Sequence, residues 1–418
     1  MSNFRIYIYL KIKYFFLSFF LGNNLAISKI TTILNKITNK KRTILTSQLR
    51  AGFLLVLKYL IKKYPKKKEI IVNSYNLAEM VSICRNLKLK IVYTQLNDNL
   101  FICEKDLKKK INKKTLAVVA TNIFNTFNNS KKIKNICNKK KVPLIEDNAI
   151  YFGNYKKLSN KKIFAGSFGD YSLNSFNIMK NISAMYGGSI STNDKKFASY
   201  ANNEITTYKN FPLFLYLKQC LIFLILKILT INFIYRLFFL NLIKKANVKK
   251  NFFILSLVYP SLKFRKQYFP NYYFTGMNRI SKNMIFLQLN DKKNFDKNHI
   301  AKKNNNMFYS KLLNEKKVKG LKLVKCVDSN YQNFNDFPII VDKKSELVNY
   351  LFSKGIETKT VQYVDCQKIF KSNKKNEKLN EYENKVLCLP NHKQISKKYI
   401  EYIVGHLRKF YINGNVQS

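Results

Sequence analysis

The stretch "AGSFGDYSLNSFNIMKNISAMYGGSISTND", residues 165–194, and the preceding stretch "VPLIEDNAIYFG", residues 142–153, together indicate the fold of this chain. The shorter stretch has the pattern of a buried strand and leads into two carboxylates, Glu146 and Asp147. The longer one contains Lys180 between two strand-like runs. A lysine and a carboxylate therefore each follow a predicted strand, within forty residues of one another.

The surrounding sequence places both stretches in one kind of sheet. Strand patterns alternate with helical patterns from about residue 42 to residue 193. This alternation predicts an α/β fold with a mostly parallel sheet that is covered on both faces. Ligands bind beyond the carboxyl ends of the strands in such sheets, where Asp147 and the loop with Lys180 are expected. The predicted strands are 69–75, 90–96, 115–124, 142–147, 170–176 and 187–193, and the predicted helices are 47–64, 76–89 and 131–141.

The pattern changes in the last third of the chain. One long helix is predicted over 278–313, followed by a strand at 336–342 and helices at 344–356 and 396–411. We expect a smaller α+β domain that closes over the first. The predicted organisation is an N-terminal basic and aromatic segment (1–41), a large domain (42–258) and a small C-terminal domain (259–418).

The formal charge of +53 is made almost entirely of lysine. Only eight arginines are present, and the excess of Lys, Asn, Ile, Phe and Tyr is spread over the whole chain without a basic arm. This pattern does not favour a nucleic-acid partner, although a basic surface attracts phosphorylated substrates and anionic lipids. The seven cysteines contain no CxxC pair, which predicts reduced thiols in a cytoplasmic protein and no zinc site.

The segment 211–243 is the most hydrophobic part of the sequence. Lys218, Lys227 and Arg236 interrupt it at nine-residue spacing, which puts successive charges on opposite faces of a helix. Three interpretations stay open: buried helices of a subunit interface, a helical hairpin on a membrane surface, or a tilted spanning segment. The apolar run within residues 1–24 is too short to span a bilayer, so we expect it to pack on the domain or lie on a membrane surface.

These segments resemble, in order and spacing, the DegT/DnrJ/EryC1/StrS family of sugar aminotransferases, which belongs to the fold-type-I pyridoxal-phosphate superfamily. The resemblance extends from about residue 46 to residue 410. It implies a large domain that binds pyridoxal 5'-phosphate, a smaller α+β C-terminal domain, and a homodimer whose active sites are shared between subunits. The segments that carry it are "IEDNAIYFG", "GSFGDYSLNSFNIMKNI", "GGSISTND", "FPIIV", "SKGIETKT" and "LCLPNHKQIS".

The resemblance also implies roles for individual residues. Lys180 would hold the cofactor covalently and then transfer protons, and Asp147 would pair with the ring nitrogen of the cofactor. Ser175 would bind the cofactor phosphate. The turn at Ser47 and Arg50, which opens a predicted helix, lies where the family has its Ser-Gly-Thr phosphate cradle.

Four positions depart from the family pattern. Ile150 stands where the family has Gln or His, and Leu77 stands where an aromatic side chain stacks on the cofactor ring, with Tyr75 as the substitute two residues earlier. Asn278 is displaced by one residue from the asparagine that reaches the neighbouring subunit's cofactor. The phosphate turn itself has become Ser-Gln-Leu-Arg, residues 47–50.

The expected function is amino transfer from an amino acid, with glutamate as the expected donor, to a keto sugar carried on a nucleotide. Such a reaction belongs to the synthesis of cell-envelope polysaccharide or glycoconjugates. The departures leave an alternative open, a degenerate member of the fold that binds a sugar nucleotide or a partner without transamination. The expected location is cytoplasmic, with a membrane-surface contact through 211–243 as a further hypothesis.

Overall fold

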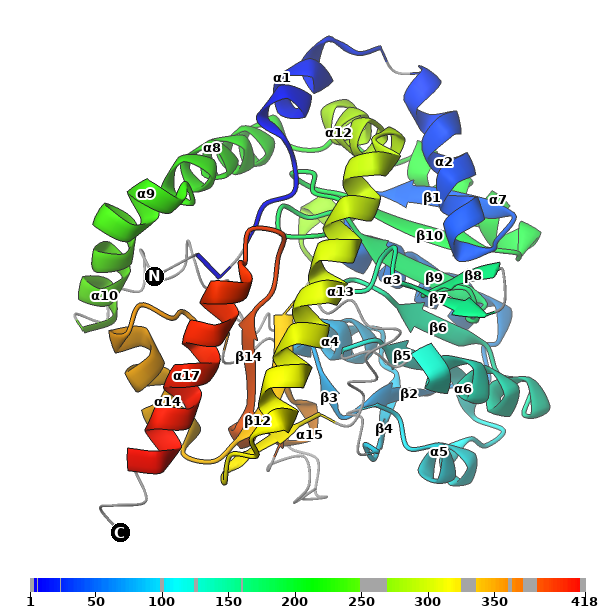
Figure 1. Cartoon of the computed structure of the whole chain (residues 1–418). Coiled ribbons are helices and arrows are strands. Elements are labelled where there is room, and N and C mark those ends of the chain that lie inside the picture. Colours follow the sequence, from blue (N-terminus) through cyan, green and yellow to red (C-terminus); the bar gives the residue numbers. More distant parts are fainter. Residues whose placement is uncertain are drawn as a thin grey trace.

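The computed structural model shows two units built on β-sheets and a helical arm along one side of them (Figure 1). The sheets hold the strands predicted from the alternating patterns. The structure describes residues 4–5, 7–22, 24–97, 101–123, 127–158, 161–248, 269–324, 336–359, 363–370 and 382–413.

The larger unit contains a seven-stranded sheet with the order β1-β10-β9-β6-β5-β2-β4. The five strands from β9 to β4 pair in parallel, and β10 and β1 add an antiparallel edge. The sheet confirms the predicted mostly parallel α/β fold. The strands are β1 Arg42–Thr46, β2 Glu69–Asn73, β4 Lys90–Thr94, β5 Thr115–Thr121, β6 Leu144–Asp147, β9 Tyr171–Ser175 and β10 Gly188–Thr192.

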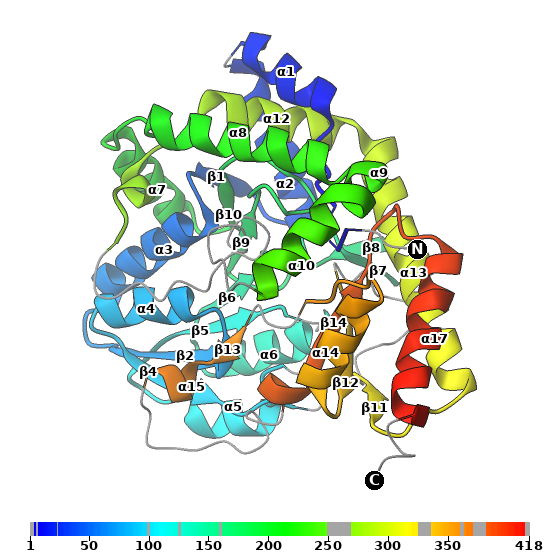
Figure 2. The same ribbon diagram turned by 90° about the vertical axis from the view of Figure 1, so that its left-hand side faces the viewer.

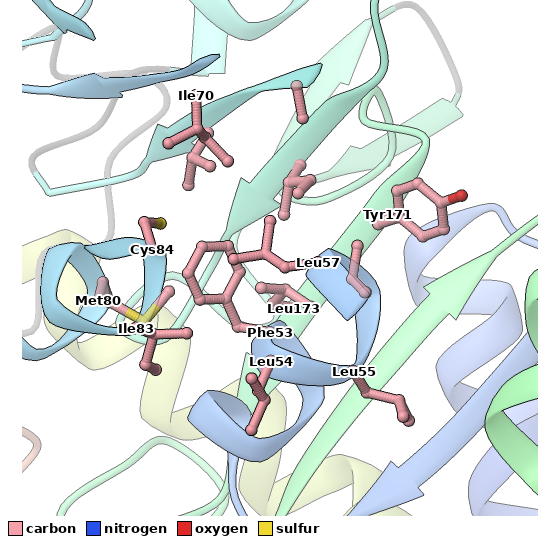
Figure 3. Packing of buried hydrophobic residues seen from close by; sticks show 14 of the residues in the cluster. Phe53, Leu54, Leu55, Leu57, Ile70, Met80, Ile83, Cys84, Tyr171 and Leu173 are labelled. Carbon is pink, nitrogen blue, oxygen red and sulfur yellow. The ribbon is translucent and has the colours of Figure 1, made fainter. Parts of the chain in front are cut away.

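Helices cover both faces of this sheet because successive strand residues point to opposite sides. Ile70 and Val72 pack with one group of helices, whereas Ile71 between them packs with another. Figure 3 shows the first side, where Phe53 and Leu57 lie against Leu173. The helices on that side are α3 Leu49–Lys63, α4 Ala78–Asn86 and α7 Lys195–Thr206, and those on the other are α5 Glu104–Lys110 and α6 Phe127–Lys139.

The smaller unit is a three-stranded antiparallel sheet with helices packed against it, as predicted for an α+β domain. Its expected boundary with the large domain, at 258/259, lies outside the described residues. Three short pieces join or flank the units: the hairpin β7 Tyr155–Leu158 and β8 Lys161–Phe164, the pair β3 Tyr75–Asn76 and β13 Val364–Asp365, and α15 Cys366–Ile369. The sheet and its helices are β11 Leu321–Leu323, β12 Asp336–Val341, β14 Val386–Pro390, α13 Lys292–Glu315, α14 Lys344–Ser353 and α17 Lys397–Asn413.

The prediction of a single long helix over 278–313 is wrong, because the helix is interrupted at Asp291. Helix α12 (Arg279–Asn290) ends before Asp291, and α13 starts at Lys292 with the Asp291 carboxylate accepting from the Asn294 N–H at 3.3 Å. The same carboxylate accepts bonds from Lys11 at 2.7 Å and Tyr14 at 2.6 Å. These partners lie at the start of the chain, Lys11 at the N-cap of helix α1 Ile12–Phe20 and Tyr14 within it, and so they leave no local signal of the break.

The segment 211–243 forms a helical arm on the outside of the molecule (Figures 1 and 2). The arm consists of α8 Leu213–Leu229, α9 Asn232–Ile234, a π-helical turn Tyr235–Phe239 and α10 Leu240–Val248. Phe223 of the arm packs on Phe15 of α1 at 4.9 Å between ring centroids, and Tyr235 packs on Phe4 at 5.4 Å. The N-terminal segment thus packs on the body of the protein, as expected.

Among the described residues, no single helix has both the length and the apolar character needed to cross a bilayer. One pair of helices in the described part of the chain, Leu213–Leu229 and Asn232–Ala246, reaches this length and apolar character when the two are taken together. The two helices are bent by 78° relative to each other.

Candidate active site

The centre of the large sheet presents Asp147 at the carboxyl end of β6. This strand lies between β5 and β9, with Asp147 opposite Thr121 and Leu173. The Asp147 side chain is buried, and its Oδ1 accepts from the Ala149 N–H at 3.0 Å. Burial raises the pKa of this carboxyl, while the Ala149 N–H and the charge of Lys180 act in the opposite direction.

Glu146, the other carboxylate of the motif, has a different task. Its Oε2 accepts from the N–H groups of Phe168 at 3.0 Å and Gly169 at 2.5 Å, so it fixes the loop before β9. A Cβ at Gly169 would lie 2.9 Å from the Glu146 side chain, which explains a glycine there. The alternation of a strand sends these neighbouring carboxylates to opposite faces, and only Asp147 interacts with Lys180.

Lys180 lies in the loop that connects β9 and β10, and local bonds define its backbone. Its N–H donates to the Asn177 carbonyl at 3.0 Å, and its own carbonyl accepts from Ser183 Oγ at 2.8 Å. Gln288 of α12 (Arg279–Asn290) then makes a reciprocal pair with Ser183, donating to its carbonyl at 2.7 Å and accepting from its N–H at 3.0 Å. The lysine is thus presented by a loop that a second helix holds in place.

The residue after the lysine ties this loop to the segment that follows Asp147. Asn181 Nδ2 donates to the Phe152 carbonyl at 3.0 Å, and its Oδ1 accepts from Lys302 Nζ at 2.5 Å. Lys302 belongs to α13, and burial lowers its pKa to about 7. Neither Lys302 nor Gln288 was predicted, since a polar residue within a polar helical pattern carries no sign that it is buried.

The environment of Lys180 favours a reactive amine. Burial is the main cause that lowers its pKa to about 8, helped by the positive charges of Lys359 and Arg50 and opposed by Asp147 and Asp336. A lysine with this pKa carries a substantial neutral fraction near neutral pH, and the neutral amine is the nucleophilic form. Lys359 and Asp336 form an ion pair at 2.8 Å in the smaller unit, so both units shape the site.

Three backbone segments meet tightly where β9 ends and β10 begins. Ser175, at the end of β9, pairs with Gly188, which pairs in turn with Thr46 at the end of β1. A Cβ at Gly188 would lie 2.3 Å from Leu49 N and 2.4 Å from the Gln48 carbonyl carbon, so only glycine allows this approach. Helix α3 begins there at Leu49 without a side-chain cap, and the free N–H groups of a helix start favour an anion.

Two of the predicted phosphate ligands, Ser47 and Arg50, form bonds with other groups of the protein. Ser47 Oγ donates to the Tyr272 carbonyl at 2.8 Å. Arg50 forms an ion pair with Glu79 and also donates to Gln48 Oε1 at 3.1 Å. A phosphate role for either residue would require a change of these bonds, and it stays a prediction, as does that of Ser175.

Tyr75, the predicted substitute for the ring-stacking residue, lies beside a second tyrosine, and its stacking role stays a prediction. Tyr75 is buried, and its ring centroid lies 5.9 Å from that of Tyr363. The charge of Asp147 contributes to raising the pKa of Tyr363, which places this ring near the carboxylate. Leu77 lies instead at the start of α4, packed against both hydrophobic cores. Tyr363 was not predicted, because its position near Asp147 depends on how the smaller unit folds back.

Two further predicted positions have structural partners. The side chain of Asn278 accepts from the Ile280 N–H at 2.8 Å and caps α12, so its predicted reach to a second subunit remains untested. Ile150 is buried in the core shared with the smaller unit. The described residues contain no group of three or more His, Cys, Asp or Glu residues that could hold a metal ion.

Comparison with known proteins finds a family that is similar to the part of the chain that holds this arrangement. A model of the DegT/DnrJ/EryC1/StrS aminotransferase family matches residues 27–210, which include β6, β9 and the Lys180 loop. Over this stretch, the chain is similar to that family.

Two curated relatives match over shorter lengths of the chain. The chain is 31% identical over 126 residues to the GDP-perosamine synthase of Vibrio cholerae, covering 30% of this chain and 33% of the relative. It is 33% identical over 116 residues to the dTDP-4-amino-4,6-dideoxy-D-glucose transaminase of Shigella dysenteriae, covering 25% of this chain and 31% of the relative. The match thus spans about a third of the length of each relative.

Solved structures match over nearly the whole chain. PseC of Helicobacter pylori, an aminotransferase in the biosynthesis of pseudoaminic acid, superposes with a TM-score of 0.73 over 99% of this chain and 100% of its own. DesI, solved in the presence of its TDP-sugar product, superposes with a TM-score of 0.70 over 99% and 95% of the two chains. At 14% identity in both cases, these likenesses show the fold.

The cofactor of this family is pyridoxal 5'-phosphate, and the residues at the sheet edge fit it. Lys180 provides an amine with a lowered pKa, and Asp147 provides a buried carboxylate that acts on it. The close approach at Gly188 leaves the uncapped start of α3 beside Ser175, a suitable place for the phosphate. Amine, carboxylate and anion site are the three groups that such a cofactor needs.

Proposed function

We propose that this protein is a pyridoxal-phosphate-dependent aminotransferase that moves an amino group from an amino acid to a nucleotide-linked keto sugar. Glutamate is the proposed donor, and cell-envelope polysaccharide or glycoconjugate synthesis is the proposed context. The observation that carries the proposal is the meeting of Lys180 and Asp147 at the carboxyl edge of the central strands. The names of the curated relatives, a perosamine synthase and an amino-sugar transaminase, support the substrate class.

Each residue has a defined task in this proposal. Pyridoxal phosphate supplies an electron sink for the carbon that gains or loses the amino group. Lys180 would attach the cofactor and, once released, would move a proton at its Nζ. Asp147 would keep the ring nitrogen protonated. Ser175 and the start of α3 would bind the phosphate, and Tyr75, just after β2, would border the site together with Tyr363.

The test of this function begins with the visible absorbance of the purified protein after incubation with pyridoxal phosphate. We expect a visible band, and after reduction with borohydride we expect the cofactor mass on the peptide that contains Lys180. The protein loaded with pyridoxamine phosphate should then lose that form when a nucleotide-linked keto sugar is added. Absence of cofactor uptake at Lys180 would contradict the proposal.

A second candidate is a member of this fold that binds without transamination. It is favoured by the bonds that hold Ser47 and Arg50 to Tyr272 and Glu79, and by the apolar Ile150. In that case the protein would bind sugar nucleotides, measured by calorimetry, without converting pyridoxamine phosphate. The single-turnover experiment therefore separates the two candidates.

The proposed assembly is a homodimer, as in the family, and the proposed location is cytoplasmic. The described cysteines are all free thiols and most are buried, which suits a reducing compartment. Sedimentation of the cofactor-loaded protein checks the assembly.

A further inference from the structure

The helical arm and α1 expose a large group of apolar side chains, which we call the apolar face. The most exposed are Phe20 at 85%, Phe214 at 77%, Phe233 at 69% and Phe238 at 65%. Elsewhere in the described chain, exposed large apolar residues are few and scattered, such as Ile300 on α13. A gathered apolar surface of this kind indicates an interaction site, whereas single exposed residues do not.

One face of the arm packs against the rest of the protein, and the opposite face is exposed. Tyr216, Cys220 and Phe223 of α8 are buried against α1 and α12. Leu217 and Leu221, on the other side of the same helix, are exposed. Figures 1 and 2 show the arm on the outside of both sheet-based units. The family match ends at residue 210, just before the arm begins, so the apolar face is not explained by the sheet-edge site.

The charge of this part of the chain is one-sided. No Asp or Glu occurs in residues 1–68 or in residues 205–290, which include α1 and the whole arm. Exposed cations lie among the apolar residues, at Lys218 and Arg236 in the arm and Lys13 in α1. These segments therefore contribute only positive charge to the apolar face, although Asp291 and Glu357 contact α1 and the arm from other parts of the chain.

We propose that the apolar face docks this protein on an anionic lipid bilayer, with the arm lying in the interface. Aromatic and aliphatic side chains would enter the headgroup and acyl boundary, while the lysines and arginine contact anionic headgroups. The proposal does not depend on the proposed enzyme activity, because it rests on a surface outside the site.

Two other occupants fit the observations less well. A spanning helix needs about 20 residues for a hydrocarbon core of about 30 Å. Helix α8 has 17, about 25 Å at 1.5 Å per residue, and the chain turns by 78° after it. Lys227 is also held in the protein, with its Nζ donating to the Ile8 carbonyl at 2.8 Å. A second copy would bring the same positive charges against each other, which opposes association.

The experiment is vesicle co-sedimentation of the full chain, without cofactor or substrate. The vesicles are phosphatidylcholine alone, or phosphatidylcholine with about one-third phosphatidylglycerol as in common anionic mixtures. We expect binding to the anionic vesicles that is at least about tenfold tighter, and that falls when salt is raised. Carbonate washing should release the bound protein, whereas a spanning segment would resist it.

Two sets of variants locate the contact. The triple variant Phe214→Ser, Leu217→Ser and Leu221→Ser should lower anionic-vesicle binding about tenfold or more, because each exposed side chain contributes apolar area. The matched control changes apolar residues exposed elsewhere, Ile300→Ser and Met307→Ser on α13, and should bind as the wild type does.

A second pair of variants tests the charges. Lys218→Gln with Arg236→Gln removes two charges near the apolar face, and Lys108→Gln with Lys109→Gln removes two exposed charges from α5, at the far end of the molecule in Figure 2. Only the first pair should weaken vesicle binding, by about thirtyfold, since about 1 kcal/mol is lost for each of the two cations. Circular dichroism verifies that every variant is folded.

Two outcomes would overturn the proposal. One is equal binding of the arm variants and the wild type to anionic vesicles. The other is no vesicle binding at all together with a smaller sedimenting species for the triple variant, which would assign the apolar face to a second copy of the chain. Under the membrane proposal the oligomeric state of the triple variant stays that of the wild type.

Discussion

The Lys180 loop and the helical arm lie close in the sequence and each hold a lysine whose pKa burial lowers to about 8. Their surroundings differ. Lys180 interacts electrostatically with the Asp147 carboxylate at the end of parallel strands, whereas Lys227 donates to a backbone carbonyl beside the rings of Tyr7 and Phe223. A lowered lysine pKa therefore does not define a functional site, and the groups placed around the amine do.

The two regions also differ in the interactions that fix their positions. The loop is fixed by polar side chains from distant elements, including the reciprocal Gln288–Ser183 pair and the bond from Lys302 to Asn181. The arm is held by ring contacts such as Phe223 on Phe15. Polar bonds specify atomic positions, as chemistry requires, while apolar contacts attach a surface without fixing each atom of it.

The largest expected effect separates the two lysines. Lys180→Ala should lower the amino-transfer rate by about a thousandfold or more, because the amine that attaches the cofactor and moves the proton is gone. Lys227→Met should leave the rate and the visible band unchanged. The rate is measured as conversion of pyridoxamine phosphate in the presence of a nucleotide-linked keto sugar. Equal losses of the amino-transfer rate in both variants would show that the different surroundings of Lys180 and Lys227 do not determine catalysis.

The next effect concerns the carboxylates around the loop. Asp147→Asn should lower the rate about a hundredfold, because an amide cannot keep the ring nitrogen protonated.

Asp147 has a raised folded-state pKa, so its charge opposes folding once the pH is above the unfolded-state pKa. The cofactor-free variant should therefore unfold, in a urea titration at neutral pH, at the same urea concentration as the wild type or a higher one.

The matched control is a carboxylate with a structural task. Asp170 accepts from Lys134 at 2.6 Å and from the Leu144 N–H at 2.8 Å. Asp170→Asn should lower the free energy of unfolding by about 1 kcal/mol while the cofactor-loaded enzyme keeps its turnover. A loss of turnover in this variant at full cofactor occupancy would extend the site beyond Asp147.

A smaller effect tests the tight approach beside the loop. Gly188→Ala should lower the free energy of unfolding by about 2 kcal/mol, because the added Cβ would strike the backbone of Gln48 and Leu49. It should also weaken cofactor binding, measured by titration of the visible band. Gly405→Ala in α17 is the control, since a Cβ there meets nothing within 4 Å and alanine favours the helix. An unchanged free energy of unfolding in Gly188→Ala would contradict the close approach of Gly188 to Gln48 and Leu49.

The smallest effect is in the pH dependence of stability of the cofactor-free protein. Lys302 has a folded-state pKa of about 7, below its unfolded value. From about pH 7 upward to the unfolded pKa, the unfolded state binds more protons, so Lys302 makes the free energy of unfolding rise with pH. Lys302→Met should reduce this rise by up to about 1 kcal/mol per pH unit. Lys297→Met, at an exposed position of the same helix, should keep the slope, measured by urea unfolding at several pH values.

Most of the fold was predictable because each strand and helix of the large unit carries its own periodicity. The strands within 142–147 and 165–194 lie where their patterns put them, and the parallel pairing of β6 with β9 brings Asp147 and the loop with Lys180 to the same edge of the sheet. The predicted helix over 278–313 failed because Asp291 is bound by Lys11 and Tyr14. Contacts between residues so far apart in the chain leave no local pattern.

The sequence by itself determined the layers of the sheet, the lysine and its carboxylate, and the apolar character of residues 211–243. The tertiary structure alone decided that Ser47 and Arg50 bond within the protein, that Tyr363 comes near Asp147, and that one side of the arm stays exposed. The physical reason is the range of the interactions. Periodicity acts over a few residues, whereas burial, ion pairs and shifted pKa values depend on which distant segments the fold brings together.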